Sequence, residues 1–240
     1  MPIHLHEITL DEFSVRAALI RGTRSCLIWD TLTHPRDMAG LREIQAECPT
    51  FIAYSHADWD HIWGTAAFDA AIPVIAHRHC RLRFETDVPR TLAEFQRDQP
   101  GKWDEVRLVP PVLTFENELD VDLGGLTVQL HHLPGHTKDS LVAFLPEANL
   151  LLAGDTVEWP CPCVPATCDL DRWIDGLNSW RDQPGLRVIP SHGPVGGVEL
   201  LDRTVVYLDG LRLGHPMAMP AVTAFYARAH QENLLNRGLV

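Results

Sequence analysis

Two kinds of hydrophobic pattern alternate along the chain. Short apolar runs that end in polar or glycine-containing turns predict strands, and segments in which apolar residues recur every three or four positions predict helices. Two pairs of runs enclose short turns, at 21–24 and at 124–125, and are expected to form hairpins. Strands are expected at 13–20, 25–30, 51–54, 73–76, 119–123, 126–130, 141–145, 150–152 and 187–189.

Helical patterns occupy most of the remaining chain. One helix is expected after Thr33 with Pro35 in its first turn, and a helical stretch at 78–98 is expected to break at Pro89. Further helices are expected at about 170–180, 198–213 and 218–235. Strands precede helices in both halves of the chain. This order predicts an α/β (α+β) fold in one domain over 1–240, a four-layer αββα sandwich with two sheets face to face.

Composition excludes several classes of protein. With 45% hydrophobic and 22% charged residues, the chain is not disordered, collagen-like or a coiled coil. Its net charge of −12 argues against a nucleic-acid partner, and no apolar run approaches the roughly 18 residues of a membrane helix. The N-terminus has no signal-peptide pattern, so a cytoplasmic location is expected. There the six cysteines are expected to be thiols: Cys26, Cys48, Cys80, Cys161, Cys163 and Cys168.

A dense cluster of metal-binding residue types follows the strand predicted at 51–54. His56, Asp58, Asp60 and His61 fall within six residues, and alternate residues of an extended loop can face one point. Imidazole nitrogens with carboxylate oxygens suit zinc, iron or manganese. A solvated polar loop is the alternative interpretation of this cluster taken alone.

Three later residues strengthen the metal-site interpretation. His136, Asp155 and His192 each follow an apolar strand and a small-residue turn, a place where side chains are presented at a sheet edge. Each one alone is typical of an ordinary turn. Their recurrence in this order behind the first cluster favours one shared site.

The ordered set resembles the metallo-β-lactamase superfamily. Its signature is His-x-His-x-Asp-His, then a later His, a bridging Asp and a final His, and Asp30-Thr31 stands where the family usually has Asp-Thr-Gly. The resemblance implies two divalent metal ions and hydrolysis by a hydroxide held between them, with Asp60 and Asp155 as catalytic residues. It implies a first site of His56, Asp58 and His136, a second of Asp60, His61 and His192, and Asp155 bridging both.

One position departs from the signature, because Asp58 replaces its second histidine. An anionic oxygen ligand lowers the net charge of the first site, favours iron or manganese without excluding zinc, and could leave that site weak. We therefore consider three functions. The first is a metal-dependent hydrolase of a small ester, thioester or lactone. The second is an iron-dependent redox or dioxygenase-type member of the superfamily, and the third is a non-catalytic metabolite-binding protein.

Other residues are weaker candidates. Trp59, Glu158 and Trp159 lie close in sequence to predicted ligands and could line a substrate pocket. A buried structural position is the alternative for the two tryptophans, and a solvated side chain is the alternative for Glu158. Cys161, Cys163 and Cys168 lack a standard zinc spacing and are interpreted as ordinary thiols, with a redox or metal role as the alternative. A small-molecule substrate is expected, without a nucleic-acid or membrane partner. The apolar C-terminal helices could also support a homo-oligomer.

Overall fold

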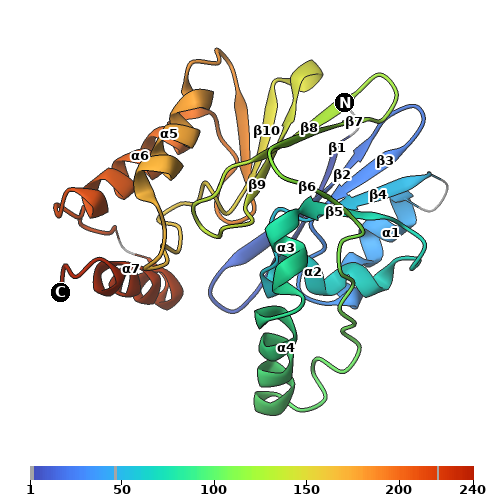
Figure 1. Ribbon diagram of the computed structural model, residues 1–240, viewed down its shortest axis with the longest axis horizontal. Helices are drawn as coiled ribbons and strands as arrows, with labels where there is room; N and C mark the ends of the chain where they lie inside the picture. The colour runs from blue at the N-terminus through green and yellow to red at the C-terminus, as the bar shows by residue number, and fades with distance from the viewer. Residues whose placement is uncertain (1–2, 46–47, 221) are drawn as a thin grey trace.

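The structure is a computed structural model that describes residues 3–45, 48–220 and 222–240. Two sheets pack face to face at its centre, and helices cover the outer face of each sheet (Figure 1). The first sheet has the order β1-β2-β3-β4-β5-β6, with antiparallel pairing from β1 to β3 and parallel pairing from β3 to β6. Its strands are β1 (Ile3–Thr9), β2 (Ser14–Arg21), β3 (Cys26–Trp29), β4 (Thr50–Ala53), β5 (Val74–His77) and β6 (Leu113–Phe115).

The second sheet has the order β11-β10-β9-β8-β7. Only β10 and β11 pair in parallel, and the other neighbours are antiparallel. Consequently β8, β10 and β11 run in the same direction and end at the same edge. The strands are β7 (Glu118–Asp122), β8 (Thr127–His132), β9 (Leu141–Leu145), β10 (Leu150–Gly154) and β11 (Arg187–Pro190).

Three hydrophobic clusters hold the layers together. Ile20, Leu130 and Leu152 belong to the cluster between the two sheets. Leu41 belongs to the cluster between the first sheet and its helices, and Trp173 to the cluster between the second sheet and its own helices. The sequence prediction of a four-layer αββα sandwich is confirmed. The prediction of one domain over 1–240 stays a prediction.

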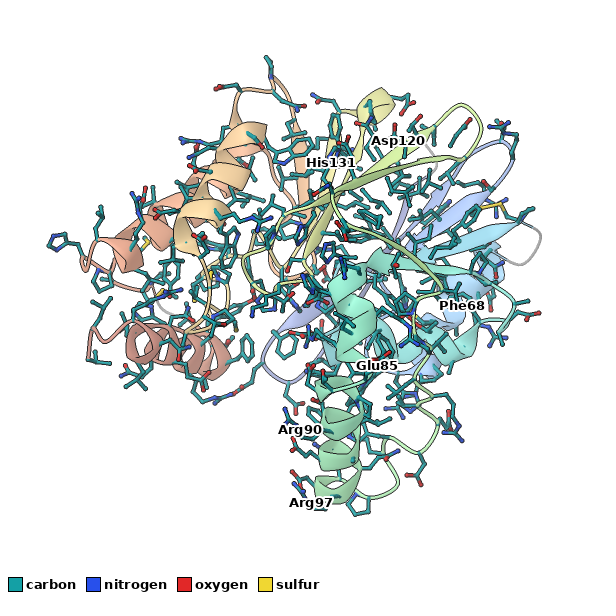
Figure 2. The ribbon with its side chains drawn as sticks, viewed as in Figure 1. Phe68, Glu85, Arg90, Arg97, Asp120 and His131 are labelled. Carbon is teal, nitrogen blue, oxygen red and sulfur yellow. A yellow bond between two sulfur atoms is a disulfide. The ribbon has the colours of Figure 1, made fainter. Side chains whose placement is uncertain are left out.

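Most predicted helices are present. The helix expected after Thr33 begins as a 3-10 turn, Pro35–Met38, and continues as an α-helix. Helix α4 extends away from the sheets, with Arg90 and Arg97 along its length (Figure 2). The helices are α1 (Ala39–Gln45), α2 (Trp59–Ile62), α3 (Arg78–Arg83), α4 (Asp87–Asp98), α5 (Leu170–Arg181), α6 (Val198–Arg212) and α7 (Ala224–Asn236).

Some element boundaries differ from the prediction. The helical stretch at 78–98 breaks between α3 and α4, before Pro89 rather than at it. Pro89 lies in the first turn of α4, where its missing N–H removes no helical hydrogen bond. Helix α7 begins at Ala224 instead of 218, after a segment that contains Pro216 and Pro220. Strands β1 and β6 and the short helix α2 were not predicted.

The expectation that all six cysteines are thiols is wrong, because Cys26 and Cys48 form a disulfide. Parallel pairing places Cys26 opposite Thr50, so the starts of β3 and β4 lie together. The two Cα atoms are 6.1 Å apart, within the range that a disulfide spans. No helix in the described ranges has the length and apolarity to cross a bilayer.

Candidate metal centre

All seven predicted ligands lie at or just beyond the carboxyl ends of four strands. His56 follows β4, His136 follows β8, Asp155 follows β10 and His192 follows β11. The shared direction of β8, β10 and β11 brings their three residues to one edge of the second sheet. The 56–61 segment reaches the same place from the first sheet. All seven residues thus meet where the two sheets adjoin.

A short helix, rather than a fully extended loop, arranges the first cluster. Asp58 stands at the N-cap position of α2 with extended backbone angles, and Asp60 and His61 lie within that helix. The helical turn places Asp60 and His61 together, while His56 and Asp58 remain on the extended part. Asp60, His61 and His56 are buried, and Asp58 is partly exposed.

The seven side chains form two triads with a carboxylate between them. His56, Asp58 and His136 have ligand atoms within 4.8 Å of one another, and so do Asp60, His61 and His192. These are the two sets that the family resemblance implies.

Asp155 faces both triads. Its Oδ2 lies 3.8 Å from His56 Nε2, 3.7 Å from His136 Nε2 and 3.2 Å from His192 Nε2. Its Oδ1 lies 3.4 Å from His61 Nε2. The Asp155 carboxylate thus lies within 4 Å of histidine nitrogens from both triads.

A hydrogen-bond chain fixes the orientation of His56 and His61. Asp30 is fully buried and accepts a bond from the Ser55 hydroxyl at 2.7 Å and from His61 Nδ1 at 3.0 Å. Because the Ser55 hydroxyl gives its single proton to a carboxylate, its oxygen accepts from His56 Nδ1 at 2.9 Å. Both imidazoles therefore carry hydrogen on Nδ1.

Backbone carbonyls orient the other two histidines. His136 Nδ1 donates to the Cys163 carbonyl at 3.1 Å, and His192 Nδ1 donates to the Ser14 carbonyl at 2.7 Å. A carbonyl can only accept, so these Nδ1 atoms also carry hydrogen. When the rings are neutral, all four Nε2 atoms turn lone pairs toward the carboxylates. Metal-ligating histidines are oriented in this way.

A centre built only from acceptors requires a positive charge. Buried His56 Nε2, His61 Nε2 and Asp155 Oδ1 have no hydrogen-bond partner among the described residues. Burial opposes charging of the histidines, yet the field of Asp155 and Glu158 raises the pKa of His192 to about 10. Burial is likewise outweighed at His136, where Asp58 and Asp155 raise the pKa to about 9. The same field would hold a metal cation, so the residues fit the divalent metal ions that the fold family implies.

The three candidate pocket residues lie in different surroundings. Glu158 is buried near Asp155 and His192, and burial, reinforced by Asp155, raises its pKa to about 7. The Trp59 ring packs 5.1 Å from Phe95 and lines a cavity of about 220 Å³ that also reaches Asp58. The Trp159 ring lies under the Arg203 guanidinium and lines a different cavity, of about 660 Å³. Substrate contact by these three residues stays a prediction.

The three cysteines after Asp155 are free in the structure. Burial raises the pKa of Cys161 to about 12 and of Cys168 to about 11, and it also raises the pKa of Cys163. These thiols therefore stay protonated near neutral pH, in keeping with the interpretation as ordinary thiols. The Cys163 backbone, however, supports His136.

Sequence reasoning did not assign a role to the residues that hold the histidines. In the sequence, Asp30 has significance only as part of the Asp30-Thr31 pair, and no pattern marks Ser55. A signal for Asp30 was available, since a carboxylate at the end of a wholly apolar strand needs a buried partner. Its partner His61 lies 31 residues away, so spacing alone could not identify it.

Comparison with curated proteins gives partial matches. The chain is 29% identical over 104 residues to a linear primary-alkylsulfatase from Pseudomonas sp. (strain ATCC 19151), covering 40% of this chain and 20% of that protein. It is 32% identical over 97 residues to a metallo-beta-lactamase type 2 from Bacteroides fragilis, covering 38% and 39%. The chain therefore matches well under half the length of these relatives.

Solved structures share the fold over most of the chain. A metallo-beta-lactamase superfamily protein from the archaeon Sulfolobus tokodaii has a TM-score of 0.73 at 14% identity, covering 99% of this chain and 97% of that one. A metallo-beta-lactamase from Pontibacter korlensis has a TM-score of 0.67 at 20% identity, covering 86% and 94%. The family model described as the Metallo-beta-lactamase superfamily matches residues 10–207. With this match and this fold, the chain belongs to the metallo-β-lactamase superfamily.

Proposed function

We propose that this protein is a metal-dependent hydrolase of a small ester, thioester or lactone. The observation that carries the proposal is the centre in which the Nε2 atoms of four histidines converge on the carboxylates of Asp58, Asp60 and Asp155. Such an arrangement is stable only when protons or cations fill it. Zinc, iron and manganese all accept this mixture of nitrogen and oxygen ligands.

Two divalent ions are proposed to bind, with Asp155 reaching both. His56, Asp58 and His136 would hold the first, and Asp60, His61 and His192 the second. When bound, such ions supply Lewis acidity toward the scissile group and make water nucleophilic near neutral pH.

The chain's own residues have distinct tasks around this chemistry. Asp30 keeps His61 in the tautomer that presents its Nε2 lone pair, and through Ser55 it does the same for His56. Asp155 lies between the triads and Asp60 lies beside His61 and His192, so either carboxylate can orient an attacking water by accepting its hydrogen bond. The burial of six of the seven proposed ligands excludes bulk water and strengthens these interactions.

The named relatives widen the choice of test substrates. One is called an alkylsulfatase and the other a metallo-beta-lactamase, so an alkyl sulfate and a β-lactam belong beside esters, thioesters and lactones in a panel.

The proposed partner is a small molecule, since a chain with a net charge of −12 repels nucleic acid. A homo-oligomer stays a prediction. So does a cytoplasmic location, and the Cys26–Cys48 disulfide counts against it because such bonds persist mainly in oxidising compartments.

The test combines elemental analysis with turnover. The purified protein is expected to hold about two divalent ions per chain and to hydrolyse at least one panel member, and chelator should abolish both properties. Asp155→Asn and His192→Ala should lose metal and activity, whereas His215→Ala, a substitution at an exposed histidine, should behave like the parent. Metal-free protein, or ligand variants as active as the parent, would refute the proposal.

The oxygen of Asp58 in the first triad favours a second candidate, an iron-dependent redox function. Carboxylate in place of imidazole suits iron better than zinc. Iron in anaerobically purified protein, with oxygen uptake on adding a thiol or persulfide, would favour this candidate over hydrolysis. Zinc alone, together with esterase activity, would count against it. Metabolite binding without turnover under any metal would indicate the third function, a non-catalytic binding protein.

A further inference from the structure

Arg83, the last residue of α3, contacts three carboxylates beside the first triad. Its Nη2 lies 2.6 Å from Asp58 Oδ1 and 2.8 Å from Asp87 Oδ2. Its Nε also donates to Asp87 at 2.9 Å, and its Nη1 reaches Asp139 Oδ1 at 3.2 Å. The planar guanidinium is thus held on both edges, which fixes its position.

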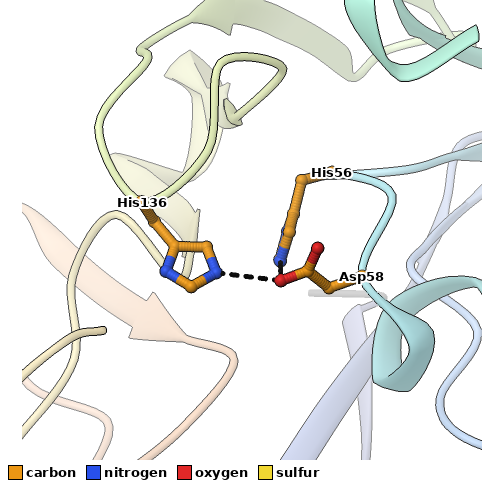
Figure 3. Close-up of side chains that lie close together, drawn as sticks. All are labelled: His56, Asp58 and His136. Carbon is orange, nitrogen blue, oxygen red and sulfur yellow. Dashed lines mark hydrogen bonds and ion pairs between the residues drawn. The ribbon is translucent and has the colours of Figure 1, made fainter. Parts of the chain in front are cut away.

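The two oxygens of Asp58 face different partners. Oδ1 is bound by Arg83, while Oδ2 lies 3.2 Å from His136 Nε2 and 3.5 Å from His56 Nε2. Figure 3 shows one oxygen directed at both histidines and the other turned away from them. Only one oxygen of Asp58, Oδ2, is therefore free to bind a metal ion together with His56 and His136.

Asp139 extends this support to the neighbouring loop. It is fully buried, and its second oxygen accepts the Ala57 backbone N–H at 2.9 Å. Arg83 and Asp139 together link the segment that carries Asp58 to the loop that carries His136. The carboxylate of Asp58 makes no capping bond to α2, so Arg83 is its main restraint.

From these contacts we infer that Arg83 is a positioning residue that makes Asp58 a one-oxygen metal ligand. The inference rests on the proposed metal centre. A histidine at this position offers one neutral donor atom. Asp58 bound to Arg83 also offers one donor atom, and the guanidinium offsets part of its negative charge. The departure from the family signature is thereby compensated by a residue outside the signature.

Arg83→Met tests this role through metal binding. After metal loading and gel filtration, the variant is expected to keep one ion with parent-like affinity, because Asp60, His61 and His192 are untouched. The other ion should be lost or bound about 10- to 100-fold more weakly in chelator competition, as for other residues that support ligands. Arg81→Met is the matched control, since Arg81 lies on the same helix in an exposed pair with Glu85. Two ions held by Arg83→Met with parental affinities would overturn the inference.

Two further variants separate positioning from folding and from charge. Asp58→His in the Arg83→Met background should regain the ion at the first site, because an imidazole presents one donor atom without help from the arginine. Failure to regain it would show that Arg83 acts on something other than Asp58. Arg83→Lys keeps the charge and a folded site but cannot span three carboxylates, so first-site affinity should still fall. Parental affinity in Arg83→Lys would overturn the inference.

The result also distinguishes this inference from the proposed function. A parent protein that holds a single ion, or none, would remove the first site and the role of Arg83 together. A parent with two ions and hydrolytic activity, combined with an Arg83→Met variant that also keeps both ions, would overturn only the role of Arg83.

Discussion

Asp30→Asn should weaken both proposed metal sites although Asp30 belongs to neither. Asp30 accepts hydrogen bonds from the Ser55 backbone N–H at 2.7 Å, the Ser55 hydroxyl at 2.7 Å and His61 Nδ1 at 3.0 Å. Asparagine replaces one accepting oxygen with an NH₂ group. If that group faces His61, the imidazole must move its hydrogen from Nδ1 to Nε2, and the lone pair then turns away from the centre.

The size of the effect follows from the bonds that are lost. A hydrogen bond to a charged group contributes about 1.5–3 kcal/mol, which corresponds to about 10- to 150-fold in affinity. We therefore expect the ion at Asp60, His61 and His192 to bind about 10- to 100-fold more weakly. A smaller loss is expected at His56, which is reached only through Ser55. Asparagine is the right probe because Asp30 has a φ of +60°, a conformation that asparagine tolerates well.

Chelator competition measures the two affinities, and ¹⁵N-detected NMR of the imidazoles reports which nitrogen carries hydrogen. Asp37→Asn is a suitable control, because that carboxylate accepts a bond from Thr33 and contacts no proposed ligand. Parental affinity for both ions, with His61 still protonated on Nδ1, would refute the reasoning.

Three other substitutions or measurements test separate features. In Gly135→Ala the new Cβ would lie 2.1 Å from Trp173, so the loop before His136 should shift, costing about 1–3 kcal/mol of unfolding free energy in denaturant titration. A cavity of about 250 Å³ beside His136 is lined by Lys138 and Arg172. Replacing both with methionine should raise KM about 10-fold for an anionic ester and leave KM for its neutral analogue unchanged. In unfolded, unreduced protein, four of the six cysteines should react with a thiol reagent, and six would contradict the disulfide.

The layered fold could be predicted because its signals are local. Strand β2 is buried along nearly its whole length, and its interior is an apolar run interrupted only by Arg16, as expected for a strand between two layers. Strand β1 is hard to predict because none of its residues is buried and its sequence, with His4, His6 and Glu7, is largely polar. It pairs only with β2 at the sheet edge, so its assignment depends on tertiary contacts.

The candidate ligands were found for a similar reason. His56, His136, Asp155 and His192 each lie within four residues after a strand, and strands that end at the same edge of a sheet bring their following residues together. The disulfide and the buried bond from Asp30 to His61 could not be found in this way. Their partners are 22 and 31 residues apart, and only the parallel pairing of β3 with β4 brings them into contact.

Asp58 shows most clearly where reasoning from a signature stops. Taken alone, an aspartate in place of a histidine adds negative charge and a second potential donor atom, and from this the sequence predicts weaker metal binding at the first site. The structure places Arg83, 25 residues later, on one of the two oxygens. Asp58, which replaces the histidine, and the Arg83 guanidinium, which restrains it, therefore act as one unit. The strength of the first site should therefore be judged from the Asp58–Arg83 pair, which no spacing within the 56–61 segment reveals.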